Sequence, residues 1–318
     1  MKTSLLLVVI LAAALIISIS TSLSDRIAYA HNFSESENAL FLTLVHQIEA
    51  QISLAQNSFP SNPKLAEQHV NVAIDLLNQD DPVVNLTWTS QISERNPRIA
   101  NELTSALNSL KNAASTTSNT TSSSVNDIKV KVDMISGLLG EAVSSRLTKE
   151  QLNNSTTQAL VLANMANEAY FSYGRALGES PSTMSNMAGM AISVNEASSS
   201  SPSPTNMSTN MNVGNNHAGM NTHVSMTNSN NNNNIKNMTQ YQTAQALASK
   251  SVEVFDKNLK STAPTSLKAA NTEIDNDLNQ LKAAIDNKAP FMDVMKIVHI
   301  QLHPTLITAY NLQLKGFQ

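Results

Sequence analysis

The chain has 318 residues, with 20 lysines and arginines against 24 aspartates and glutamates, so its net charge is −4. This balance argues against a nucleic-acid-binding protein, because phosphate groups demand a basic surface. It also provides no basic patch for anionic lipids. The sequence contains no cysteine, which excludes cysteine-based zinc sites, iron–sulfur clusters and thiol catalysis.

The first 30 residues have the pattern of a signal peptide. Lys2 precedes an apolar run at residues 5–19, and Ala28, Tyr29 and Ala30 form a small-x-small cleavage site. We therefore expect an extracytoplasmic protein, secreted or at the cell surface, whose mature chain begins at His31. The apolar run is shorter than the roughly 20 residues of a membrane span, but an uncleaved N-terminal anchor stays open. Membrane association is expected only in that case.

Asn-x-Ser/Thr sequons are frequent along the chain and fit a glycosylated surface protein. A chain rich in Asn, Ser and Thr also produces such sequons by chance, so both interpretations stay open. The sequons begin at Asn32, Asn85, Asn119, Asn153, Asn154, Asn206 and Asn237.

Apolar residues at three- and four-residue spacing predict an all-α protein, a bundle of about eight helices. The expected helices cover residues 34–57, 63–77, 89–114, 125–146, 148–177, 240–260, 265–287 and 290–313. Ser34 and Glu37 match a capping box at the first helix. We expect Pro97 to kink the third helix or to mark its true start, and Pro304 to kink the last one. The last helix is apolar on most faces, which predicts the centre of the bundle.

The domain organisation follows from one change in composition. Residues 180–238 are rich in Asn, Ser and Met and nearly uncharged, which predicts a disordered linker. It would separate a signal peptide (1–30) and an N-terminal bundle (31–179) from C-terminal helices (239–318) that pack on the bundle. The pairs Ala169-Tyr170 and Ala309-Tyr310, each in a long helix, suggest two related halves.

Methionine and histidine cluster in this segment. His217, Met220, His223 and Met226 follow one another at three-residue spacing, as do Met184, Met187 and Met190. Thioether sulfur is a soft ligand that selects Cu(I), and imidazole binds both copper states. The pattern indicates a copper site, although methionines accumulated by drift in a low-complexity segment are the competing explanation.

Two further histidine sets could bind metal. His299 and His303 are four residues apart on the last helix, and His46 and His69 lie on the first two helices. A carboxylate-rich di-iron site is not expected, because two Glu-x-x-His motifs are missing. Each histidine could equally be a hydrogen-bonded core residue. His31, once it is the N-terminus, could chelate Cu(II) through its amino group and imidazole, or stand there by accident of cleavage.

No catalytic constellation is visible. The sequence has no Gly-x-Ser-x-Gly, no P-loop, no dinucleotide fingerprint and no His-Glu-x-x-His, so we do not expect an enzyme. A metal-dependent enzyme using His299, His303 and His46 is the least favoured alternative.

Two stretches carry a resemblance. Residues 28–33 (AYAHNF) with the helix that follows, and residues 93–107 (SERNPRIANELTSAL), resemble uncharacterised exported helical proteins of ammonia-oxidising archaea. Residues 217–226 are similar to the Met/His repeats of periplasmic copper-resistance proteins. The first resemblance transfers no active-site residue but implies a copper-demanding setting.

Two functions are therefore expected. The first is an exported helical protein that binds or buffers copper through its Met/His-rich segment. The alternative is a cell-surface structural or interaction protein with envelope proteins as partners and no metal role.

Overall fold

The computed structural model describes residues 36–116, 121–184 and 234–313. Throughout these ranges the regular elements are helices and no strand occurs, so the all-α prediction is confirmed. The expected signal peptide, the position of Ser34 and most of the expected linker lie outside the described residues.

The first part of the chain forms α2 (Glu37–Ser58), α3 (Pro63–Leu77), α4 (Trp88–Arg95), α5 (Pro97–Thr116) and α6 (Ser122–Arg146). Polar side chains begin these helices. The side chain of Ser36 caps α2, so the prediction of a capping box beginning at Ser34 is wrong. Asn62, Thr87 and Thr121 cap α3, α4 and α6, and each accepts the backbone N–H of the third residue of its helix.

Pro97 marks the start of a separate helix, which is one of the two outcomes that the sequence predicted. Residues 88–116 form α4 and α5 rather than one helix, with Asn96 in an extended conformation between them. A residue before proline avoids the helical region, and proline at the first helical position leaves no backbone donor unused.

The next helices are α7 (Lys149–Leu152) and α8 (Ser155–Leu177), where one helix was expected. Asn154 caps α8 through its side chain, which separates it from α7. Gly178, with a φ of 83°, ends α8 in the left-handed conformation that glycine adopts readily. Both faces of α8 are largely buried, so α8 lies at the centre of the fold, and the central position predicted for residues 290–313 is wrong.

The C-terminal elements are α10 (Met238–Val254), η1 (Phe255–Lys260), η2 (Thr265–Leu267), α11 (Lys268–Asp286), α12 (Phe291–Lys296), η3 (Ile297–Leu302) and α13 (His303–Tyr310). Both η1 and η3 are π-helical segments that continue an α-helix. His303 alone separates Pro304 from the end of η3, so the disturbance expected at this proline takes the form of a wider helical turn before it.

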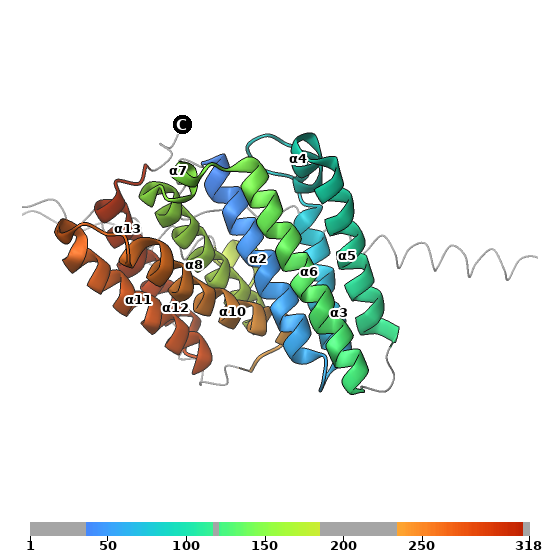
Figure 1. Cartoon of the computed structure of the whole chain (residues 1–318). Helices are drawn as coiled ribbons and strands as arrows, with labels where there is room; N and C mark the ends of the chain where they lie inside the picture. The colour runs from blue at the N-terminus through green and yellow to red at the C-terminus, as the bar shows by residue number, and fades with distance from the viewer. Residues whose placement is uncertain (1–35, 117–120, 185–233, 314–318) are drawn as a thin grey trace, which may run out of the picture.

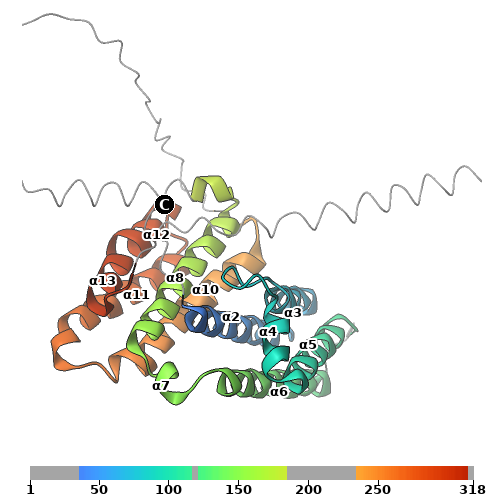
Figure 2. The same cartoon turned by 90° about the horizontal axis from the view of Figure 1, so that it is seen from above.

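The helices form two adjoining groups (Figures 1 and 2). The helices α2 to α6 lie together on one side, and α8 lies with α10 to α13 on the other. α8 packs most extensively on α10, so the boundary expected at residue 179 runs between two helices that pack together. None of the described helices is long and apolar enough to cross a membrane.

Candidate functional site

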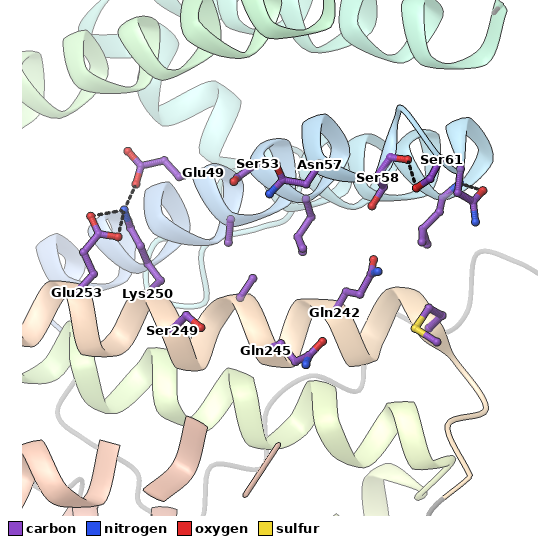
Figure 3. Close-up of a pocket in the computed structure, with 16 residues that line it drawn as sticks. Glu49, Ser53, Asn57, Ser58, Ser61, Gln242, Gln245, Ser249, Lys250 and Glu253 are labelled. Atoms are coloured by element: carbon purple, nitrogen blue, oxygen red, sulfur yellow. Dashed lines mark hydrogen bonds and ion pairs between the residues drawn. The ribbon is translucent and has the colours of Figure 1, made fainter. Parts of the chain in front are cut away.

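A groove lies between α2 and α10, and we call it the α2–α10 groove. It encloses about 810 Å³, a volume typical of small-ligand sites. The two helices lie side by side and run in opposite directions along it (Figure 3). Half of its 16 lining side chains end in a hydroxyl or an amide: Ser53, Asn57, Ser58, Ser61, Asn62, Gln242, Gln245 and Ser249.

One end of the groove is charged. Lys250 Nζ lies 3.2 Å from a carboxylate oxygen of Glu49 and 3.3 Å from one of Glu253. His46 Nδ1 lies 3.1 Å from a carboxylate oxygen of Glu49. Burial raises the pKa of Glu49, but the hydrogen bond from His46 and the charge of Lys250 outweigh it and lower the pKa overall. This end therefore holds a persistent ion-paired carboxylate.

A buried polar network lies beneath the groove wall. The side chain of His69 is fully buried, with Nδ1 2.8 Å from Gln51 Oε1 and Nε2 2.8 Å from Gln242 Oε1. Gln51 Nε2 donates to the Thr243 hydroxyl, which donates to the Thr239 carbonyl. His69 is thus a hydrogen-bonded core residue that joins α2, α3 and α10.

The network holds the His69 ring from both sides. Gln51 donates its NH₂ to Thr243, and its oxygen faces Nδ1. The oxygen of Gln242 faces Nε2. Burial lowers the pKa of His69, although the hydrogen bond with Gln242 opposes this. The ring therefore fixes the position of Gln242 in the groove wall.

His299 and His303 lie together elsewhere, against α8. Their ring centroids are 5.1 Å apart, and His299 meets the Tyr170 ring edge-on at 4.9 Å. His303 Nε2 lies 3.3 Å from the Ala163 carbonyl oxygen. Across the residues that the structure describes, no group of three or more histidines and carboxylates is close enough to hold a metal ion. The structure brings His299 and His303 together but joins neither to His46 and His69 in such a group.

Met184 has a different setting from the one expected. It is 2% exposed, its backbone carbonyl accepts a 3.0 Å hydrogen bond from the Tyr170 hydroxyl, and its sulfur packs against Gly174. The ordered core therefore continues to Met184, inside the range expected to be a linker. Met187, Met190, His217, Met220, His223, Met226 and His31 lie outside the described residues.

Sequence reasoning missed the groove. Gln242, Gln245 and Ser249 recur at three- and four-residue spacing on α10 without a charged residue between them. A helix face of neutral amides and hydroxyls is unlike an ordinary solvated face, which carries charge, and this signal could have found it.

The fold and the groove define a class: an all-α protein with a polar, open groove between two antiparallel helices. Comparison of the chain with protein-family models, curated proteins and solved structures gives no match.

Proposed function

We propose that the protein is exported and binds copper through the Met/His-rich segment that contains His217, Met220, His223 and Met226. The observation that carries the proposal is the three-residue spacing of these soft and borderline ligands. Groups spaced in this way can converge on one ion when the metal itself organises the chain. Met187 and Met190 could supply further thioethers.

The way in which the helical body holds the ends of this segment supports the proposal. Before it, Met184 is fixed by Tyr170, and after it, the backbone N–H groups of Lys236 and Asn237 donate to the Ala176 carbonyl at 2.8 and 3.2 Å. Both ends thus attach near the C-terminus of α8. Fixed ends raise the local concentration of ligands, and the entropy of closing a loop grows only slowly with its length.

A Cu(I) titration tests this function. The chain from His31 onward is compared with a variant in which His217, Met220, His223 and Met226 are all alanine. A matched control replaces two exposed methionines on the helices, Met134 and Met292. We expect the quadruple variant to bind Cu(I) at least tenfold more weakly and the control to bind like the parent. Equal affinity of the parent and the quadruple variant would contradict the proposal.

Export and the role of His31 have their own test. N-terminal sequencing of the native protein should begin at His31, and Cu(II) affinity should fall when one residue is added before it. A native product that retains residues 1–30 in the cytosol would overturn export. A retained leader in the envelope would instead support the anchor.

The loop between α3 and α4 favours a second candidate function, a cell-surface interaction protein. Val83, Val84 and Leu86 are 40% to 48% exposed at its tip. Buried Asp81 holds the loop in shape, because its carboxylate accepts from the Val83 N–H at 2.7 Å and from Gln91 at 2.9 Å. A preorganised apolar tip loses little entropy when a partner covers it.

Crosslinking in the native envelope tests this second function. Serine at Val83, Val84 and Leu86 should abolish recovery of a partner that the parent crosslinks in metal-free buffer. Serine at Val130 and Met134, which are exposed on α6, serves as the control and should leave recovery unchanged. Identical products from all three proteins would exclude the loop as an interface.

A further inference from the structure

The α2–α10 groove presents two facing rows of hydrogen-bonding groups. Ser53 and Asn57 come from α2, and Gln242, Gln245 and Ser249 come from α10 (Figure 3). Amides both donate and accept, and hydroxyls do the same. An extended polypeptide backbone alternates N–H and C=O groups and matches such rows without needing a particular side chain.

The composition of the lining argues against other ligand classes. No aromatic ring lines the groove to stack on a sugar or a base. Its lining cation, Lys250, is paired with Glu49 and Glu253, which leaves it unsuited to a phosphate. A neutral ligand rich in hydrogen-bonding groups fits best.

The length of the groove is consistent with a peptide. Its lining on α10 extends from Met238 to Glu253. At roughly 1.5 Å per residue this helix segment spans about 22 Å. An extended chain rises about 3.3 Å per residue, so the groove accommodates six or seven residues.

His69 holds one wall residue in a defined orientation. Its Nε2 lies 2.8 Å from the Gln242 oxygen, so the Gln242 NH₂ is directed away from the ring. Gln51 and Thr243 hold the ring from the other side. Gln242 thereby offers its NH₂ to a ligand C=O.

We propose that the α2–α10 groove binds an extended, uncharged stretch of polypeptide and that His69 is the positioning residue that holds the Gln242 amide in the groove wall. This site is separate from the copper-binding segment, and neither proposal depends on the other.

An NMR titration tests the site. The probe is the acetylated and amidated hexapeptide Asn-Ser-Asn-Ser-Asn-Ser, added to the isotope-labelled chain from His31 onward. We expect the side-chain amide signals of Asn57 and Gln242 to shift. Gln242→Leu and Ser53→Leu should each weaken binding at least tenfold, the second by filling the groove without touching the His69 network. Gln301→Leu, at an exposed position on η3, is the control and should leave binding unchanged.

Three results would overturn the proposal. The hexapeptide could leave the groove signals unshifted, both leucine variants could bind it like the parent, or a tetramer of N-acetylglucosamine could bind there in place of the peptide. The role of His69 has its own readout in the long-range ¹H–¹⁵N spectrum of its ring. We expect a proton on Nε2, which donates to the Gln242 oxygen, and a ring without a proton on Nε2 would refute the positioning role.

Discussion

The helices α2 to α6 and the helices α11 to α13 are fixed at their ends in different ways. In the first group Ser36, Asn62, Thr87 and Thr121 cap the helices to which they are adjacent. In the second group no side-chain cap begins α11, α12 or α13. Residues adjacent to each helix therefore fix the helix starts in the first group. In the second group the helices depend on contacts with residues outside their own termini.

Hydrogen bonds from tyrosines far away in the sequence fix the second group at other positions. The Tyr241 hydroxyl donates to the Ile285 carbonyl at 3.0 Å, at the C-terminal end of α11. The Tyr173 hydroxyl donates to the Ala289 carbonyl, between α11 and α12, and Tyr310 on α13 donates to Asn271 on α11. The comparison teaches that the C-terminal helices depend on tertiary contacts, so substitutions in matched positions should affect the two groups differently.

Glycine gives the largest expected difference. At Gly174 on α8 an added Cβ would overlap the Met184 sulfur and come within 2.9 Å of the Phe291 ring of α12. We expect Gly174→Ala to lower the free energy of unfolding by about 3 kcal/mol, as overpacking does. At Gly140 on α6 nothing lies within 4 Å of such a Cβ, and Gly140→Ala should stabilise by ~0.5–1 kcal/mol. Chemical denaturation of both variants measures this, and a shift of the same sign in both would contradict the packing.

A buried carboxylate on α11 gives the next largest effect. Burial, with a smaller contribution from the charge of Glu273, raises the pKa of Asp277 to about 6. The folded protein keeps a proton on Asp277 that the unfolded chain releases. The contribution of the protonated carboxyl group to the free energy of unfolding is therefore complete below pH 3.8 and is lost as the pH rises through about 6.

Asp277→Asn should therefore raise the free energy of unfolding by about 2 kcal/mol at pH 8 relative to the parent protein, with the gain disappearing at pH 4. Asp133→Asn, on the exposed face of α6, is the matched control and should change it by less than ~0.5 kcal/mol. Denaturation curves from pH 4 to 8 measure both. A gain for Asp277→Asn that does not vary with pH would contradict the buried carboxylate.

The tyrosine contact at α11 gives a smaller effect. Tyr241→Phe removes a hydroxyl that donates to the carbonyls of Ile285 and Asp286. It should lower the free energy of unfolding by about 1.5 kcal/mol. Hydrogen exchange should show the loss in α11 before it appears in α3. Uniform loss of protection across both helices would mean that Tyr241 does not hold α11 in particular.

The smallest effect belongs to a local cap. Thr121 and Ser124 form a capping box at α6, and Thr121→Ala should cost about 1 kcal/mol. Its effect on hydrogen exchange should stay within the first turns of α6. Faster exchange in α11 would break the distinction between locally and distantly fixed helix ends.

The sequence predicts the helices well because their signals are local. Pro63, Pro97 and Pro290 each stand at or next to the first residue of a helix, and apolar spacing identifies the buried faces. The π-helical segments η1 and η3 were not predicted, because an extra residue in a helical turn leaves no clear periodicity. The tyrosine contacts were not predicted either, because they join residues far apart in the chain.

The candidate site was predicted only in part. A hydrogen-bonded core residue was one of the two interpretations of His69, and the structure buries it, but its link to Gln242 crosses between α3 and α10. His46 and Glu49 lie three residues apart on one helix, so their contact is a local feature of the sequence. Composition placed Met184 in the expected linker together with its neighbours. Its burial depends instead on Gly174, which leaves room for the Met184 sulfur.

The most direct test of the proposed copper function is the metal content of the native protein. The chain and its quadruple alanine variant at His217, Met220, His223 and Met226 are expressed in the native host, purified from its envelope and analysed for bound metals. We expect copper with the parent chain at a stoichiometry near or above one and its loss in the variant. Parent protein from copper-replete cells that carries no copper, or equal copper in both proteins, would contradict the proposal.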